Sequence, residues 1–271
     1  MQNPGYVLGH SEQELSRLST QARFLESATR GFLHEAGLST GMRVLDVGSG
    51  VGDVAFLAAD LVGRNGTIIG TDKVAAAVAA ATAGARDRGL GNVSFRVGDP
   101  AGMSFEQPFD AVVGRYVLLF QADASAMVQA LARKLRPGGL VVFHEPDWVN
   151  ARSVPAVPTY ERCCRWLQDV FRLSGTDSNM ADRLYGIFVR AGLREPFMRM
   201  QTFIGGGAAT NGFLDALSDL TATLLPAMVR LGVSTEAEVN IATLADRLKH
   251  EISANGSVVI GRSEVGIWAR V

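Results

Sequence analysis

Three glycines at alternate positions separate an apolar run from a helical pattern. Gly48, Gly50 and Gly52 follow Arg43–Val47, whose apolar residues fall on both faces, as a buried parallel strand requires. Because glycine has no Cβ, the turn can be tight and a ligand can approach its backbone closely. The amides at the start of the helix that follows, Val54–Leu61, can donate hydrogen bonds to that ligand.

A carboxylate follows each of the next two predicted strands. Asp72 directly follows the strand predicted over Thr67–Thr71. Asp99 follows the strand Val93–Val97. At the carboxyl edge of an open α/β sheet, Asp72 can accept both ribose hydroxyls of an adenosine, and Asp99 lies where an adenine amino group could be read. A nicotinamide dinucleotide is the alternative, but the G-x-G-x-x-G pattern needs glycine where Asp53 stands.

Five motifs occur here in an order and spacing that are specific to one protein family. They are VLDVGSGVGD at 44–53, IIGTD at 68–72, VGD at 97–99, FDAVVGRYVLLF at 109–120 and LRPGGLVVF at 135–143. Through them the stretch from Arg43 to His144 resembles the class I S-adenosylmethionine-dependent methyltransferases. The resemblance implies S-adenosylmethionine as the cofactor and methyl transfer as the reaction, with the protein supplying position and electrostatics.

The resemblance also implies which residues hold the cofactor. Asp46, before the glycine turn, would lie near the amino-acid end of the cofactor, and the turn would lie beneath that end. Asp72 would bind the ribose and Asp99 the adenine, although Pro100 removes one amide there. Arg115 would line the methionine side. The full set of expected contacts is Gln21, Asp46, Gly48, Ser49, Gly50, Asp72, Lys73, Asp99, Pro100 and Arg115.

The N-terminal segment, with Tyr6-Val-Leu-Gly-His10 followed by Arg17 and Gln21, resembles a subgroup that acts on small molecules. In that subgroup an N-terminal helix folds over the cofactor. Residues 1–36 are therefore predicted to form a helical lid that places Tyr6 at the substrate.

Candidate catalytic residues follow the fifth predicted strand. His144 or Glu145 could position a substrate amine or take a proton from a hydroxyl, and a purely local polar role is the alternative for both. His144 is the first choice as the base, and His10 joins it if the lid closes. Tyr160 and Trp166 recur at near-helical spacing. Packing of a cap is the favoured interpretation for them, and an aromatic wall for a flat substrate is the alternative.

Strands and helices alternate along 43–144, which predicts βαβ units. We expect a doubly wound, mostly parallel, seven-stranded Rossmann-like α/β sheet with helical cap elements. The expected strands beyond those above are Phe109–Gly114, Leu140–His144, Phe197–Ile204 and Ser257–Ala269, and the long helix Ala122–Leu135 is expected to stop at Pro137. The core should comprise 37–149, 176–209 and 253–271, with 150–175 and 210–252 as a helical cap over the substrate pocket.

Composition narrows the class of partner. The chain of 271 residues is 47% hydrophobic and has 26 basic against 27 acidic residues, a net charge of -1. This balance argues against a nucleic-acid surface. We expect no membrane span, no metal site, a cytoplasmic location and a small, mostly apolar substrate of secondary metabolism; apolar cap helices could pair two subunits into a homodimer. A non-methylating S-adenosylmethionine-binding protein or cyclase is the main alternative, and a nicotinamide-dependent oxidoreductase is disfavoured.

Overall fold

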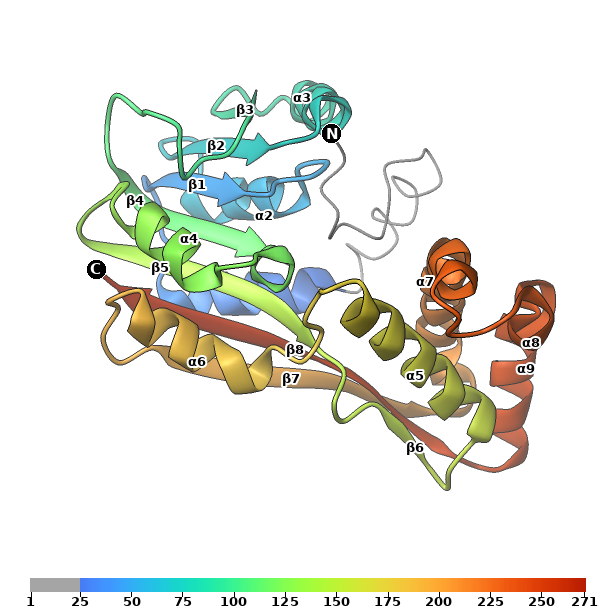
Figure 1. Cartoon of the computed structure of the whole chain (residues 1–271). Coiled ribbons are helices and arrows are strands. Elements are labelled where there is room, and N and C mark those ends of the chain that lie inside the picture. Colours follow the sequence, from blue (N-terminus) through green and yellow to red (C-terminus); the bar gives the residue numbers. More distant parts are fainter. Residues whose placement is uncertain (1–24) are drawn as a thin grey trace. The chain divides into compact units, whose positions relative to one another are not determined.

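The structure is a computed structural model that describes residues 25–271, and these divide into two compact units (Figure 1). The sheet unit comprises Leu25–Glu145, Met180–Met200 and Val265–Val271. The helical unit comprises Pro146–Asn179 and Gln201–Glu264. Three strands, β5 (Leu135–Asp147), β7 (Phe197–Gly206) and β8 (Val258–Arg270), have residues in both units.

The sheet unit contains a mostly parallel sheet with the strand order β3-β2-β1-β4-β5-β8. Its other strands are β1 (Arg43–Val47), β2 (Thr67–Asp72), β3 (Val93–Val97) and β4 (Phe109–Arg115). β1 pairs in parallel with both β2 and β4, β2 with β3, and β4 with β5. From β1 the chain adds β2 and then β3 on one side. It then crosses to the other side of β1, where β4 and β5 follow. The carboxyl ends of β1 and β4 form the topological switch point, where open α/β sheets bind ligands.

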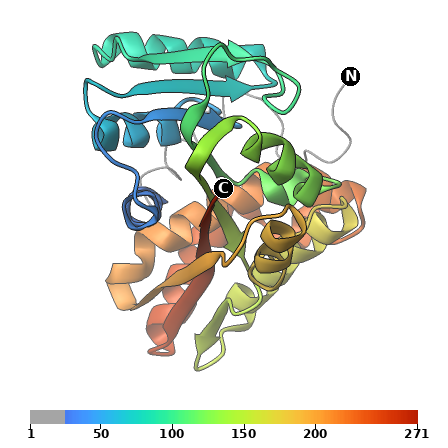
Figure 2. The same cartoon turned by 90° about the vertical axis from the view of Figure 1, so that its left-hand side faces the viewer.

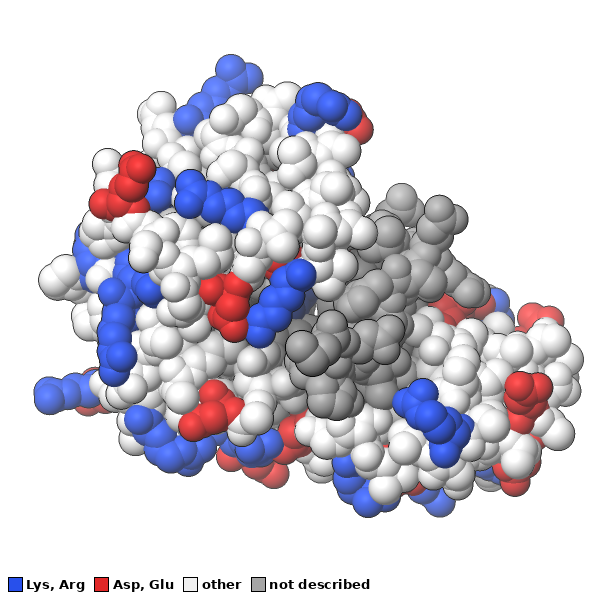
Figure 3. All heavy atoms as spheres, turned by 45° about the horizontal axis from the view of Figure 1, so that its top comes forward, with Lys and Arg blue, Asp and Glu red and all other residues white. Residues whose placement is uncertain are grey.

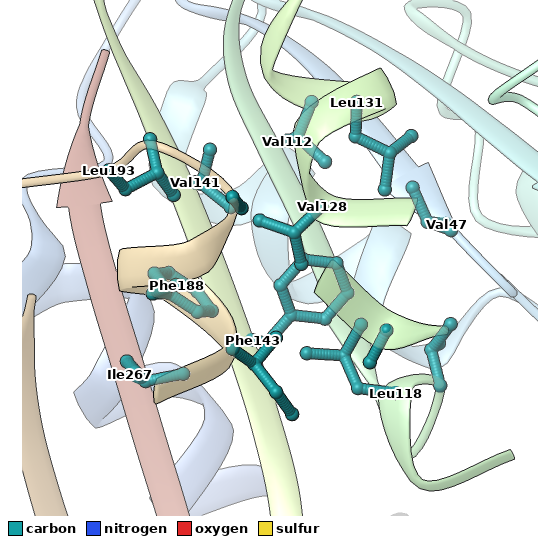
Figure 4. Packing of buried hydrophobic residues seen from close by; sticks show 14 of the residues in the cluster. Val47, Val112, Leu118, Val128, Leu131, Val141, Phe143, Phe188, Leu193 and Ile267 are labelled. Atoms are coloured by element: carbon teal, nitrogen blue, oxygen red, sulfur yellow. The ribbon is translucent and has the colours of Figure 1, made fainter. Parts of the chain in front are cut away.

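Alternate residues of each strand point to opposite faces of the sheet. Because apolar side chains occur on both faces, helices cover both (Figure 2). Residues 25–36 and α2 (Asp53–Val62) pack on the face that carries Val44, Val113 and Val142. The other face packs against α4 (Ala124–Ala132) and α6 (Ala181–Arg190). Figure 4 shows part of that second cluster, whose labelled residues are Val47, Val112, Leu118, Val128, Leu131, Val141, Phe143, Phe188, Leu193 and Ile267. The predicted doubly wound α/β sheet is confirmed.

The helical unit has a hydrophobic core of its own. Its elements are β6 (Arg152–Val154), α5 (Pro158–Leu173), η2 (Gly207–Thr210), α7 (Asn211–Arg230), α8 (Glu236–Val239) and α9 (Ile241–Ala254). α7 packs against both α5 and α9, and β6 pairs antiparallel with β8. α8 begins with a capping box in which the Thr235 hydroxyl accepts the Glu238 amide and the Glu238 carboxylate accepts the Thr235 amide.

Two local expectations about the fold need correction. The helix predicted over Ala122–Leu135 ends at Ala132, and β5 already begins at Leu135, so Pro137 lies inside a strand. The pairing of β4 with β5 shifts register there, which is how a strand accommodates extra residues. Gly139 permits the shift, because a Cβ on it would lie 2.9 Å from the Arg136 carbonyl oxygen. The eighth strand, β6, was not predicted at all.

The remaining elements of the sheet unit are α3 (Ala75–Asp87), which packs on β2 and β3, and the short helix η1 (Leu118–Phe120) after β4. Within residues 25–271, one helical stretch has the length and hydropathy of a membrane span. This stretch, Gly207–Arg230, is the helix that packs inside the helical unit, and 44% of its most apolar window is buried.

Candidate active site

The glycine turn lies at the switch point, between β1 and α2. Gly48, Gly50 and Gly52 have φ angles of 64°, 52° and 97°, a region that side chains with a Cβ rarely adopt. A Cβ on Gly48 would meet the Val117 side chain at 2.8 Å, so Gly48 is required for packing. A Cβ on Gly50 would meet nothing within 4 Å. Among the described residues, the space beside Gly50 is therefore open, as a turn that receives a ligand requires.

Asp72 supports this turn from the end of β2. Its carboxylate accepts the amide of Gly50 at 2.9 Å and the amide of Val74 at 2.8 Å. The Ser49 amide in turn donates to the Thr71 carbonyl at 2.9 Å. A carboxylate has about four lone-pair sites, so Asp72 can hold the turn and still accept further hydrogen bonds.

Two buried polar side chains beside the turn lack protein partners within residues 25–271. Asp46 is fully buried, and neither of its carboxyl oxygens has a donor in full hydrogen-bond geometry among these residues; the Ala55 amide only weakly favours its charged form. Burial raises the pKa of Asp46 from 3.8 to about 8, although the positive charge of Arg115 opposes the shift. The Ser49 hydroxyl is also buried without a partner. Buried polar groups are normally satisfied, so these two groups mark a place where a polar ligand fits.

Arg115, at the end of β4, joins the turn to the N-terminal helical residues. Its guanidinium lies 3.5 Å from the Asp53 carboxylate and donates to the Thr29 hydroxyl at 3.3 Å. Burial raises the pKa of Asp53 above its usual value, and the positive charges of Arg115 and Arg88 oppose this shift without cancelling it. The structure thus places Arg115 and Asp46 near the same turn.

Asp99 and Lys73 come together across the ends of β2 and β3. The Lys73 ammonium lies 2.9 Å from the Asp99 carboxylate, which also accepts the Ala101 amide at 3.0 Å. Burial raises the pKa of Asp99, but these partners outweigh it and hold the pKa below its usual value. Both side chains are largely exposed, whereas Pro100, which follows Asp99 in the chain, is buried. The Asp99–Lys73 ion pair is therefore exposed, next to the ends of β2 and β3.

His144 and Glu145 end the portion of β5 in the sheet unit, and both are buried. The His144 Nδ1 atom lies 3.0 Å from the Thr29 hydroxyl. The Glu145 carboxylate accepts the amides of Val117 at 2.9 Å and of Leu118 at 2.7 Å, and so holds the start of η1. These bonds correspond to the local role that the sequence left open for Glu145.

Other predicted site residues lie elsewhere. Tyr160 and Trp166 are in the helical unit, where both are buried members of its hydrophobic core. The Tyr160 hydroxyl donates to the Ile260 carbonyl at 2.9 Å. These positions agree with the packing role that was favoured for the two aromatic residues. Tyr6, His10 and Gln21 lie outside the described residues.

Sequence reasoning missed Thr29. It is a buried polar residue in the helical residues 25–36, four residues after the buried Leu25 and three before the buried Phe32. A hydroxyl at this spacing from apolar residues is the one signal that could have drawn attention to it.

The chain is similar to known proteins in both sequence and fold. A family model described as "Methyltransferase domain" matches residues 38–192. Nocamycin O-methyltransferase of Saccharothrix syringae is 38% identical over 47% of this chain and 46% of that protein. Aklanonic acid methyltransferase DauC of a Streptomyces strain is 37% identical over 44% of this chain and 54% of that protein. The chain spans about half the length of these curated relatives.

Solved structures show the same fold at lower identity. The YcgJ protein of Bacillus subtilis superimposes with a TM-score of 0.57 at 19% identity, over 90% of this chain and 99% of that one. The [4+2]-cyclase SpnF gives a TM-score of 0.55 at 22% identity, over 90% of this chain and 80% of that one.

Proposed function

Because the chain belongs to the class I S-adenosylmethionine-dependent methyltransferases, we propose that it methylates an oxygen, nitrogen or carbon atom of a small, mostly apolar molecule in secondary metabolism. The cofactor is S-adenosylmethionine. The observation that carries the proposed site is a pair of buried groups, Asp46 and Ser49, that have no side-chain hydrogen-bond partner among residues 25–271 and lie near Gly50, whose backbone is open within the same residues.

The chemistry of these residues fits the cofactor. Its amino-acid end carries an ammonium group that can donate to Asp46 and a carboxylate that can accept from Ser49 or from the turn amides. Its ribose hydroxyls suit the remaining lone pairs of Asp72, and its adenine suits the exposed Asp99 and Lys73 at the next strand ends. Arg115 would position the methionine side through its contact with Asp53.

When bound, S-adenosylmethionine supplies an electrophilic methyl group on a sulfonium. The protein's contribution is then orientation, which can be worth roughly 7–11 kcal/mol in a step of this kind. We propose His144 as the group that accepts a proton where the acceptor is a hydroxyl. Glu145 is assigned no chemical step, because its carboxylate holds backbone amides.

The substrate class is supported by the relatives and by the surface. Nocamycin O-methyltransferase and aklanonic acid methyltransferase are named for natural products, and other relatives are named as C-methyltransferases of ubiquinone and menaquinone biosynthesis. On the face drawn in Figure 3, Lys and Arg side chains are interspersed with Asp and Glu among uncharged residues. Such a face lacks the single-sign field that a nucleic-acid substrate favours. The homodimer, the helical cap and the cytoplasmic location stay predictions.

Calorimetric titration tests the cofactor site. We expect S-adenosylmethionine and S-adenosylhomocysteine to bind and NAD not to bind. Ser49→Ala removes a hydroxyl that has no described protein partner, so stability should change by less than about 0.5 kcal/mol while affinity falls about tenfold, the worth of one hydrogen bond. Ser153→Ala is the matched control, because its hydroxyl accepts the Val157 amide at 2.8 Å. This control should lose about 1 kcal/mol of stability and keep full affinity. Equal affinities in all three proteins would remove the assignment of Ser49.

Transfer of label tests the reaction. The protein is incubated with S-adenosylmethionine labelled in its methyl group and a panel of apolar phenols, carboxylic acids and quinols. A product that carries the label and has gained one CH₂ unit supports methyl transfer. A product of unchanged composition, with the cofactor bound but intact, would instead favour the cyclase alternative.

A further inference from the structure

Two phenylalanine rings pack beside the glycine turn, on the face of the sheet that α2 covers. Phe95 belongs to β3 and Phe56 to α2, and both are partly buried. Their ring centroids are 6.0 Å apart and their planes meet at 81°, the edge-to-face arrangement that aromatic pairs prefer. β2 lies between β3 and β1 (Figure 1). Phe95 must therefore reach across β2 to come near the turn.

Gly70, in the middle of β2, lets the Phe95 ring reach that far. A Cβ on Gly70 would lie 2.4 Å from Cδ1 and 2.5 Å from Cε1 of Phe95, closer than real Cβ atoms come to other carbons. The ring therefore occupies the place that a side chain at position 70 would take. The Cβ of Ser49 lies 3.0 Å from the same point. Phe95 and Ser49 are thus neighbours over Gly70, and the buried Ser49 hydroxyl has no partner among residues 25–271.

The same ring also reaches the last glycine of the turn. A Cβ on Gly52 would lie 3.0 Å from Cζ of Phe95 and 2.7 Å from Cζ of Phe56. The Phe95 ring therefore extends from the backbone of β2 to the end of the turn. Phe56 is covered by Arg88 of the α3 region, whose guanidinium carbon lies 4.3 Å from its ring centroid, a cation–π distance. Because packed atoms transmit displacements, the Phe95 ring fixes the separation between β2 and the turn.

The hydrogen bonds that tie the turn to β2 depend on this separation. The Ser49 amide donates to the Thr71 carbonyl at 2.9 Å, and the Gly50 amide donates to the Asp72 carboxylate at 2.9 Å. Both acceptors directly follow Gly70 in β2. A shift of the turn relative to Gly70 would therefore weaken both hydrogen bonds, because their strength falls as the distance and angle leave the normal range.

We propose that Phe95 is a positioning residue for the cofactor: its ring holds the turn from Ser49 to Gly52 against β2 and so sets the affinity for S-adenosylmethionine. This inference rests on the proposed cofactor site, and it assigns Phe95 no contact with the cofactor. Leucine at position 95 lacks the ring atoms that reach Gly52, so the turn can fluctuate relative to Asp72. A cofactor that binds both the turn and Asp72 must then order the turn as it binds, which lowers its affinity.

Amide hydrogen exchange, followed by NMR, tests this role without any ligand. In Phe95→Leu the amides of Ser49 and Gly50 should exchange at least about tenfold faster than in the wild type, because local opening of the turn becomes easier. Phe188→Leu is the matched control. Phe188 is fully buried in α6 on the other face of the sheet, edge-on to Phe143 with ring centroids 6.3 Å apart (Figure 4).

The control separates a loss of global stability from a loss of order in the turn. Phe188→Leu should lower Tm at least as much as Phe95→Leu, since Phe188 is the more deeply buried of the two. It should leave the exchange of the two turn amides within about twofold of the wild type, because they open locally. Exchange in Phe95→Leu that matches the wild type, or that matches Phe188→Leu, would overturn the proposal.

Calorimetric titration with S-adenosylmethionine supplies the second measurement. Phe95→Leu should bind about tenfold more weakly, the equivalent of one hydrogen bond, and Phe188→Leu should bind as tightly as the wild type. Gly70→Ala should also weaken binding, because its Cβ displaces the Phe95 ring. In the double variant Gly70→Ala/Phe95→Leu the two losses should not multiply, since leucine leaves room for that Cβ. Losses that multiply would show that the two residues act independently, contrary to the proposal.

Ser49→Ala distinguishes a failure of this inference from a failure of the proposed cofactor site. If Ser49→Ala weakens binding and Phe95→Leu does not, the site stands and the role of Phe95 is overturned. If neither variant weakens binding although the turn amides exchange faster in Phe95→Leu, the turn does not hold the cofactor. The proposed site then fails, and the effect of Phe95 on affinity fails with it.

Discussion

Replacing Asp46 by asparagine removes an ionisation that the fold opposes. Asp46 is fully buried at the end of β1, and burial raises its pKa from 3.8 to about 8. In the unfolded chain the carboxyl group ionises above about pH 4, whereas in the folded chain it keeps its proton until about pH 8. Between these values the native state binds more protons, so the stability of the wild type falls as pH rises. Asparagine cannot ionise and escapes this loss.

The size of the effect follows from the shift. One pKa unit corresponds to about 1.4 kcal/mol, so raising the pH from 5 to 8 should lower the stability of the wild type by about 4 kcal/mol relative to Asp46→Asn. Urea unfolding of both proteins at a series of pH values measures the difference. Comparison with the variant cancels the titration of groups that the two proteins share.

Asp110→Asn is the control, because the fold lowers the pKa of Asp110 whereas it raises the pKa of Asp46. Burial raises the pKa of Asp110, but bonds from the Arg43 amide and the Arg136 guanidinium outweigh it and lower the pKa below its usual value. The Asp110 carboxylate is ionised from pH 5 to 8 in both the folded and the unfolded protein. The difference in unfolding free energy between Asp110→Asn and the wild type should therefore stay constant over this range. A gap between Asp46→Asn and the wild type that is equally constant would refute the reasoning about Asp46.

Further substitutions test other parts of the site. Gly50→Ala should lose about 1–2 kcal/mol of stability because its φ is positive, and it should bind S-adenosylmethionine at least about tenfold more weakly in calorimetry. Gly41→Ala is the control, since Gly41 has a φ of 86° and equally open space: it should lose a similar stability and keep its affinity. Glu145→Gln should lower the unfolding free energy by about 2 kcal/mol, because a carboxylate that accepts backbone amides is replaced by a neutral group; unchanged stability in urea would contradict its structural role. Gly266→Ala should lose about 1–3 kcal/mol in thermal unfolding, since its Cβ would lie 2.5 Å from the Phe32 ring.

Local pattern carried much of the fold, because strands and glycine turns leave short-range signals. The run at Arg43–Val47 was predicted with the bounds that the structure has, since a buried strand is apolar on both faces. Val93–Val97 was also predicted with its bounds, and there the apolar residues alternate with Ser94 and Arg96, as in a strand at the edge of a sheet. The end of α4 was misplaced because Pro137 is compatible with a helix stop, while the register shift of β5 depends on the neighbouring strand. The three-residue β6 exists only through its pairing with β8.

The sequence by itself determined the family, the cofactor and the turn with its strand-end acids, because these lie in contiguous motifs whose geometry a βα unit imposes. Only the tertiary structure decided what surrounds them. Thr29 and His144 are in hydrogen-bond contact although 115 residues separate them in the sequence. The Glu145 carboxylate accepts amides that lie 26 to 28 residues earlier in the chain. The pKa of Asp46 likewise depends on burial beneath packed elements. No local periodicity encodes such distances, since hydrogen bonds and desolvation at these positions arise from segments that folding brings together.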